Sequence, residues 1–298
     1  MKYLAKRTDK DFVILSLTDI HLMDEHWENN TEDAYRIFDA TVRSLVKQTN
    51  PDLIVITGDI SMAGQMIAYR RFGEYIEQFA IPWALTWGNH DQEYGIADVS
   101  SVLELYRNCP HFIHEDGDPM LGNGNCLIGI TEREKLLHTL FMVDSHSYTD
   151  VGGRKEYDKL WPGQLDWYRA EARRIKDLGC THSTMFMHMP IYAYNDAWKA
   201  VQKGECQAAF GVRNEDICSY PLEDHVFALL SEMGITQTVI AGHDHTNSFG
   251  VPYEGILLAY GLKTGKPSYS LPELNGGTVL TVDQNGECRV EHLYVPYP

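Results

Sequence analysis

An α/β fold is predicted for this 298-residue chain, with helices covering both faces of a largely parallel β-sheet. In the first half of the sequence, short and continuously apolar segments alternate with helical patterns. Uninterrupted apolar strands are typical of parallel sheets whose two faces are both covered. The chain is 44% hydrophobic, which supplies a sizeable core, and no repeat or low-complexity linker divides it. We therefore expect one domain over residues 1–298.

The first half contains three expected strands and two expected helices in alternation. The strands are expected at 12–17, 53–56 and 83–86, and the helices at 31–49 and 65–79. Apolar residues recur every three to four positions in the first helix, as on one buried face. Thr31 is its expected N-cap, and Asn50-Pro51 ends it.

The second half has less regular signals. Strands are expected near 126–130, 140–143, 184–187 and 238–241, and helices over 161–179 and 221–234. Two final strands, 278–282 and 288–293, flank Asn285-Gly286, a strong hairpin signal. Residues 192–220 are read as a long loop. Because Tyr192, Tyr194 and Trp198 begin it, we expect this loop to cap a pocket and select substrate.

The charge balance excludes several classes of partner. The chain has 25 Lys and Arg against 42 Asp and Glu, a net charge of −17, and no basic cluster. Nucleic-acid and membrane partners are therefore not expected. The first residues lack the apolar stretch of a signal peptide. The six cysteines form no C-x-x-C pair, which indicates reduced thiols, so a cytoplasmic location is expected.

Five short polar strings follow the ends of apolar segments. They are Asp19-x-His21, Gly58-Asp59, Gly88-Asn89-His90-Asp91, His188 and Gly242-His243-x-His245. In open α/β sheets, ligands bind beyond the carboxyl ends of the strands. Glycines before Asp59, Asn89 and His243 suit sharp turns and close backbone approach. We expect the five strings to converge on one edge of the fold.

These residue types are typical of a metal site. The candidate ligands are carboxylates, imidazoles and one amide: Asp19, His21, Asp59, Asn89, His188, His243 and His245. Mixed nitrogen and oxygen donors favour Mn, Fe, Zn or Co over calcium or magnesium. Seven ligands are too many for one four-coordinate ion and suit two ions that share a bridging carboxylate.

The five strings together resemble the signature of the calcineurin-like metallophosphoesterases, in identity and in order. The resemblance implies a two-sheet mixed β-sandwich flanked by helices, with two metal ions at the strand ends. By position, Asp19, His21 and His245 would hold the first ion, and Asn89, His188 and His243 the second. Asp59 would bridge the two ions. His90 would be the catalytic residue that faces the leaving-group oxygen.

A narrower resemblance points to one branch of this family. Residues 88–93, 122–125, 143–145 and 242–247 resemble the purple-acid-phosphatase-like branch named for a dosage-dependent cell-cycle regulator phosphatase. Purple acid phosphatases carry a tyrosine three residues after the bridging aspartate, where this chain has Met62, so a colourless protein is expected. Ser/Thr phosphoprotein phosphatases have there an aspartate that orients the catalytic histidine. Another group must therefore orient His90, a backbone carbonyl being one candidate.

The expected reaction is hydrolysis of a phosphate ester. Two divalent ions bring about +4 of charge against about −2 from Asp19 and Asp59, so the pocket can hold an anion. Water between two such ions ionises near neutral pH and attacks phosphorus in line, while protonated His90 donates to the leaving oxygen. Phosphorylated small molecules, nucleotides or phosphoproteins are the expected substrates.

Three functions stay open at the level of sequence. A phosphomonoesterase is favoured by the narrower resemblance, and a phosphodiesterase, for example of cyclic nucleotides, would use the same ligands. A non-catalytic scaffold is disfavoured, because it has no use for His90. His26 is a further candidate for the pocket wall. Residues 261–266 approach a phosphate-binding loop but lack its spacing and its Ser/Thr, so no nucleotide loop is assigned there.

Overall fold

Two β-sheets pack face to face at the centre of the molecule. The computed structural model describes residues 1–28, 33–62, 66–93, 99–115 and 117–297. The strand order is β14-β13-β2-β3-β4 in one sheet and β1-β5-β6-β9-β10-β12-β11 in the other. Both sheets contain parallel and antiparallel pairs. The residue patterns alone predicted one parallel sheet, which is wrong, whereas the two-sheet sandwich implied by the family resemblance is confirmed.

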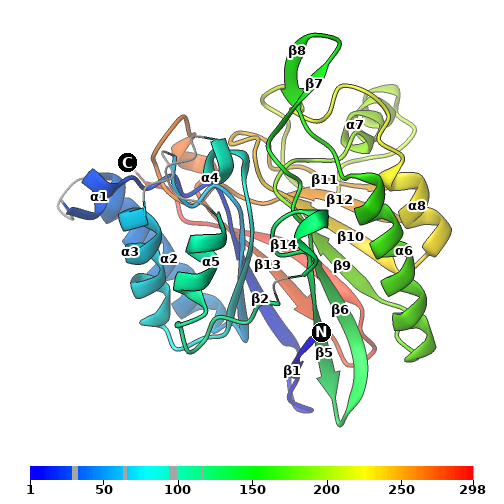
Figure 1. The fold of residues 1–298 in the computed structure, drawn as a ribbon, viewed down its shortest axis with the longest axis horizontal. Coiled ribbons are helices and arrows are strands. Elements are labelled where there is room, and N and C mark those ends of the chain that lie inside the picture. The colour runs from blue at the N-terminus through cyan, green and yellow to red at the C-terminus, as the bar shows by residue number, and fades with distance from the viewer. Residues whose placement is uncertain (29–32, 63–65, 94–98, 116, 298) are drawn as a thin grey trace.

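The five-stranded sheet carries the first helices on its outer face (Figure 1). Its strands are β2 (Phe12–Leu17), β3 (Leu53–Thr57), β4 (Trp83–Thr86), β13 (Gly276–Val282) and β14 (Cys288–Tyr294). The helices on this side are α1 (Asp24–Glu28), α2 (Asp33–Thr49), α3 (Met66–Glu77) and α5 (Val99–Tyr106). The expected N-cap Thr31 lies outside the described residues. The expected hairpin joins β13 to β14.

The seven-stranded sheet is covered by the later helices. Its strands are β1 (Lys2–Ala5), β5 (Cys126–Glu132), β6 (Lys135–Met142), β9 (Ser183–Phe186), β10 (Thr236–Ala241), β11 (Gly250–Tyr253) and β12 (Ile256–Tyr260). Its helices are α6 (Pro162–Asp177), α7 (Ala193–Lys203) and α8 (Val226–Met233). Short 3-10 turns lie at Pro119–Leu121 and Pro272–Leu274.

Two small elements stand at one end of the sandwich. Helix α4 (Asn89–Glu93) follows β4 directly, and a separate hairpin consists of β7 (Tyr148–Val151) and β8 (Arg154–Tyr157). Figure 1 shows this hairpin projecting from the top of the molecule. Neither element was predicted from the sequence.

The alternation of side chains along each strand explains the layers. In β2, Ile14 points to the interface between the sheets, and Leu15 packs against the helices. In β3, Val55 likewise points to the interface between the sheets, and Ile54 packs against the helices. Successive side chains point to opposite faces of a strand, so a strand covered on both sides is apolar at every position. The continuous apolar segments thus reflect a sheet on one face and helices on the other.

Residues 192–220 differ from the loop that was expected. The first part of this segment forms α7, and Tyr194 is fully buried against Phe249 and Tyr260 in the core of the seven-stranded side. Trp198 packs on Phe249. These aromatic side chains therefore stabilise the fold rather than line a pocket. Among the described residues, no helix combines the length and the apolar character needed to cross a bilayer.

Candidate metal centre

The structure brings all seven candidate ligands to one edge of the sandwich. Asp19 follows β2, and Asp59 follows β3. Asn89 is the first residue of α4, which comes after β4. From the other sheet, His188 follows β9, and His243 and His245 follow β10. Each of the seven is at most 8% exposed. Two sheets thus deliver their strand ends to a common buried polar centre, as the sequence predicted.

One group of donor atoms consists of Asp19, His21 and His245, whose donor atoms lie within 4.8 Å of one another. The Nε2 atoms of the two histidines are 3.0 Å apart, and Nε2 of His245 is 3.4 Å from Oδ1 of Asp19. Nδ1 of His245 donates to the backbone oxygen of Tyr269 at 2.9 Å. This hydrogen bond directs Nε2 into the group, as in histidines that bind metals.

The second group consists of Asp59, His188 and His243, again within 4.8 Å. Asn89 joins it, because its Oδ1 lies 3.1 Å from Nε2 of His188. Nδ1 of His188 donates to the backbone oxygen of Thr57 at 2.8 Å, which directs Nε2 into the group. The donor set of both groups is nitrogen and oxygen, without a thiolate among the predicted ligands.

Asp59 lies between the two groups. Its Oδ2 is 3.5 Å from Nε2 of His21 and 3.3 Å from Nε2 of His188. Its Oδ1 accepts a hydrogen bond from the backbone N–H of His90 at 2.9 Å. Among the described residues, Oδ2 of Asp59 and Nε2 of His243 are buried without a hydrogen-bond partner. Buried polar atoms rarely lack a partner, so this arrangement fits a pair of cations that share the Asp59 carboxylate.

The backbone is strained where these side chains are presented. Asp19, His21, Asp59 and His243 have φ values of 54°, 54°, 53° and 78°, in the left-handed region that residues other than glycine seldom adopt. Such strain costs of order 1–3 kcal/mol per residue and clusters at functional sites. A Cβ on Gly88 would lie 2.0 Å from Oδ1 of Asp59, so only glycine allows that carboxylate its position.

The histidines of the centre differ in their protonation. Burial lowers the pKa of His243 to about 3 and that of His21 well below its usual value, so both imidazoles are neutral at pH 7. Burial would also lower the pKa of His188, but the adjacent carboxylate of Asp59 raises it to about 10. Because a neutral imidazole is the form that binds a metal ion, binding at His188 would release a proton.

Two buried charged residues that the sequence analysis did not assign support the centre. Lys263 donates from Nζ to the backbone oxygen of Asp19, and burial lowers the pKa of Lys263 to about 8. It belongs to the 261–266 string that was set aside as an incomplete phosphate-binding loop. Asp91 accepts hydrogen bonds from the backbone N–H groups of Asp59 and Gly88 and from the hydroxyl of Tyr69. Burial, with the nearby Asp59, raises the pKa of Asp91 to about 6.

His90 lies beside the centre and is oriented by Glu93. Its ring is 5.3 Å from that of His21, and its side chain is 23% exposed. Nδ1 of His90 is 2.7 Å from Oε2 of Glu93, one helical turn further along α4. The contact does not have hydrogen-bond geometry, so we treat it as an electrostatic pair. The carboxylate of Glu93, rather than a backbone carbonyl, therefore contacts and orients His90, which the side chain of Met62 cannot do.

The strings at 122–125 and 143–145 tie α4 to the seven-stranded sheet. The carboxylate of Asp144 accepts from the side-chain amide of Gln92 at 3.2 Å and from the backbone N–H of Asn123 at 2.7 Å. Ser145 accepts from the backbone N–H of Met189, next to His188. These hydrogen bonds fix the segment that carries His90 and the segment that carries His188 relative to each other.

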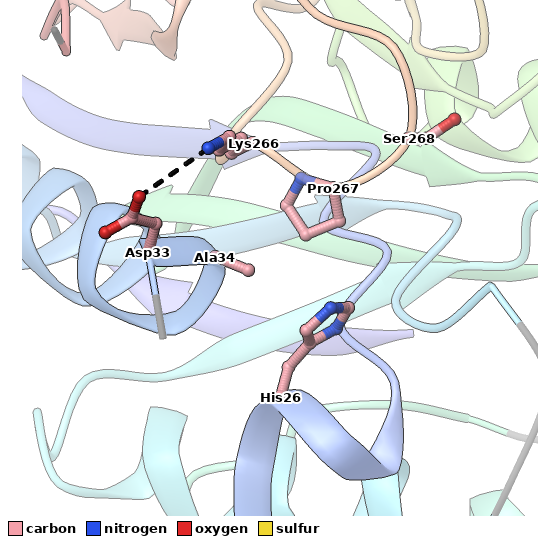
Figure 2. Close-up of a pocket in the computed structure, with 6 residues that line it drawn as sticks. All are labelled: His26, Asp33, Ala34, Lys266, Pro267 and Ser268. Carbon is pink, nitrogen blue, oxygen red and sulfur yellow. Dashed lines mark ion pairs between the residues drawn. The ribbon is translucent and has the colours of Figure 1, made fainter. Parts of the chain in front are cut away.

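His26, the further candidate for the pocket wall, lines a cavity of about 390 Å³ (Figure 2). The other lining residues are Asp33, Ala34, Lys266, Pro267 and Ser268, with an ion pair of 3.8 Å between Lys266 and Asp33. None of the seven candidate ligands lines this cavity. Ser268 in its lining precedes Tyr269, whose ring stacks on that of His245 at 4.1 Å. The cavity is therefore a neighbour of the donor groups and not part of them.

Comparisons with known proteins agree with this geometry. Residues 12–247 match the family model described as calcineurin-like phosphoesterase. The chain is 26% identical to Phosphatase DCR2 of Saccharomyces cerevisiae over 83% of this chain and 46% of that protein, so it spans about half the length of this relative. It is 26% identical to the Probable inactive purple acid phosphatase 14 of Arabidopsis thaliana, over 90% of this chain and 74% of that protein.

A solved structure shares the fold. The crystal structure of a dimetal phosphatase from Danio rerio superimposes with a TM-score of 0.62, at 16% sequence identity, over 97% of this chain and 100% of that chain. At this identity the likeness is evidence for the fold alone. It supports the two-sheet arrangement of the sandwich.

Proposed function

Since the chain belongs to the calcineurin-like phosphoesterase family, a family of metal-dependent phosphoester hydrolases, we propose that it is a phosphomonoesterase that works with two metal ions. The position of Asp59 carries the proposal. Its unpartnered Oδ2 lies between two groups of donor atoms. Similarity to a protein named as a phosphatase supports monoesters as the substrates.

The residues divide between two ions in this proposal. Asp19, His21 and His245 would hold the first ion, while Asn89, His188 and His243 would hold the second, and Asp59 would bridge them. The donor set favours Mn, Fe or Zn. When bound, the pair would supply Lewis acidity toward the phosphoryl oxygens and an acidified water.

The protein's own groups would position the substrate and move the proton. His90 would donate a proton to the leaving oxygen, and Glu93 would hold its ring in place. The backbone N–H of His90 fixes the bridging carboxylate at the same time. His90 would thus link the proton donor to the bridging carboxylate through its own backbone.

The name of one relative raises the non-catalytic alternative. Purple acid phosphatase 14 of Arabidopsis is called probably inactive. This chain has seven ligand-type residues in two converging groups, and His90 beside them contacts Glu93. A scaffold would have no use for a buried, strained group of ligand-type side chains in which Oδ2 of Asp59 and Nε2 of His243 lack a partner, so we favour the enzyme.

The compartment and the substrate belong to the proposal as well. We retain phosphorylated small molecules, nucleotides or phosphoproteins as the substrates. The cytoplasm remains the expected location, supported by the six cysteines, all of them among the described residues, which form no disulfide.

Hydrolysis of p-nitrophenyl phosphate and of bis(p-nitrophenyl) phosphate tests the proposal. The protein is first treated with a chelator and then given Mn²⁺, Fe²⁺, Zn²⁺ or Co²⁺. We expect the chelated protein to be inactive and a transition metal to restore turnover of the monoester. Preferential turnover of the diester would replace the proposal with a phosphodiesterase. Failure to cleave either ester with any metal would favour the scaffold.

A further inference from the structure

The β7–β8 hairpin is anchored to the candidate metal centre through two tyrosines. The hydroxyl of Tyr148 accepts from the side-chain amide of Asn89 at 3.3 Å. The ring of Tyr157 meets that of His243 edge-on at 4.5 Å and stacks on Tyr148 at 5.4 Å. Through these contacts the hairpin rests on the side of the centre that holds Asn89 and His243.

The same face of the hairpin presents a lysine next to the proton donor. Tyr148 pairs with Tyr157 across the strands, and Lys155 lies two residues before Tyr157, so all three side chains share one face. Nζ of Lys155 is 3.5 Å from the centre of the Tyr148 ring and 3.6 Å from Oε1 of Glu93. The other oxygen of Glu93 contacts His90. The carboxylate of Glu93 therefore lies between Lys155 and His90, the group that would protonate the leaving oxygen.

The charge of Lys155 is available to a ligand. Its side chain is 63% exposed, and its contact with Glu93 is longer than the contact of Glu93 with His90. Asp150, directly opposite Lys155 in the ladder, uses Oδ1 to accept from the backbone N–H of Gly153. An exposed ammonium held by an aromatic ring at a fixed place can bind an incoming anion.

From this placement we infer that Lys155 binds an anionic group on the leaving half of the substrate. The preferred substrates are then phosphomonoesters whose leaving group carries a second negative charge, such as a carboxylate or another phosphate. The inference rests on the proposed function, because His90 marks the leaving-group side. It adds a determinant of specificity on an element outside the sequence signature of the family.

Two isosteric esters test the inference on the metal-loaded full chain. The substrates are 4-carboxyphenyl phosphate and 4-carbamoylphenyl phosphate, which differ in charge but hardly in shape. The measured quantity is the ratio of their kcat/KM values, compared between variants so that intrinsic reactivity cancels. We expect Lys155→Met to lower the ratio, carboxylate over carboxamide, about three- to fivefold. Lys155→Glu lowers it further, and Lys155→Arg retains it.

Arg154→Met is the matched control. Arg154 lies next to Lys155 on the opposite face of the hairpin and pairs with Glu156 at 3.6 Å, so its loss removes one positive charge without touching the centre. The ratio in this variant should equal that of the wild type.

The outcomes are distinguishable. An unchanged ratio in Lys155→Met overturns the inference, as does an equal fall in Arg154→Met, which would indicate only a diffuse field. If both esters slow equally in Lys155→Met, Lys155 acts on Glu93 and not on the leaving group, which also overturns it. Wild-type protein that hydrolyses neither ester refutes the proposed function instead.

Discussion

At the scale of single residues, His90 is the group that most clearly separates catalysis from metal binding. It lies outside both donor groups, and its side chain faces the centre beside His21. We expect His90→Ala to lower kcat by about 10²–10³, the usual cost of a missing charge-stabilising donor. Elemental analysis should find the same metal content as in the wild type. Loss of metal, or full activity, would contradict the role assigned to His90.

Glu93 should act only through His90. Glu93→Gln removes the negative charge 2.7 Å from Nδ1 of His90, so the ring loses the partner that orients it. We expect kcat to fall about tenfold, with the metal content of the wild type, because the ring of His90 is held less firmly in the position from which it donates to the leaving oxygen.

A double-mutant cycle checks that assignment. In the His90→Ala background, Glu93→Gln should cause little further loss, because the two residues act as one unit. Two losses that multiply would show that Glu93 acts independently of His90.

Sequence reasoning located the seven donor residues and His90 but not the residues that support them. The donor residues follow recognisable strand ends, so their convergence could be anticipated from topology. Glu93 lies in a helix of five residues, too short for a periodic pattern, although its i, i+3 spacing from His90 was available as a signal. The contact of Lys263 with Asp19 crosses 244 residues of sequence, and no local pattern encodes it.

At the scale of elements, the β7–β8 hairpin positions a candidate ligand through Tyr148. The hydroxyl of Tyr148 accepts from the amide of Asn89, which leaves Oδ1 of Asn89 directed at His188. Partners that orient a ligand typically contribute 10–100-fold in metal affinity. We expect Tyr148→Phe to weaken the second ion about tenfold and the first ion hardly at all.

A metal titration followed by calorimetry measures the two affinities separately. Tyr3→Phe, a change at an exposed tyrosine of the edge strand β1, is the matched control. Equal affinities for both ions in Tyr148→Phe and the wild type would show that the hairpin does not orient Asn89.

The hairpin and α7 escaped prediction for different physical reasons. The hairpin strands are short and contain no fully buried residue, so they lack the alternation of apolar side chains that marks a half-buried strand. Helix α7 does have apolar residues at helical spacing, at Ala193, Tyr194, Ala197 and Val201. Its aromatic residues were expected to cap a substrate pocket. Tertiary packing instead places Tyr194 in the core and Trp198 against it.

At the scale of the whole molecule, two sheets replace the single sheet expected from residue patterns. A continuously apolar strand shows only that both of its faces are covered, and either a helix or a second sheet can cover a face. The pattern therefore does not distinguish one sheet between helices from two packed sheets. Contacts between distant segments determine which of the two forms. Nδ1 of His138 in β6 donates to the backbone oxygen of Gly286 in the β13–β14 turn, and its Nε2 accepts from Thr184. His138 thus joins the two sheets in its neutral form.

This buried histidine makes the stability depend on acid. Burial lowers the pKa of His138 to about 4, against about 6.5 in the unfolded chain. Between these values the unfolded chain binds one more proton, so the free energy of unfolding falls as the pH falls, by up to about 3 kcal/mol in total. We expect His138→Gln to make the slope shallower by about 1 kcal/mol per pH unit in this window.

Denaturant unfolding at a series of pH values between 4 and 6.5 measures the slope. His225→Gln, a change at a histidine before α8 whose side chain is 80% exposed, should leave the slope of the wild type. Parallel slopes for the wild type and His138→Gln would contradict the assignment of this acid sensitivity to His138.

The central claim is that seven side chains from two sheets hold a pair of metal ions. Anomalous diffraction at the metal absorption edges, from crystals of the metal-loaded protein with phosphate, tests it most directly. We expect two peaks, one among Asp19, His21 and His245 and one among Asn89, His188 and His243, with Asp59 between them. The Asp59→Asn variant should lose both peaks or retain them weakly. A single peak, or ions bound elsewhere while these side chains stay as they are, would contradict the account.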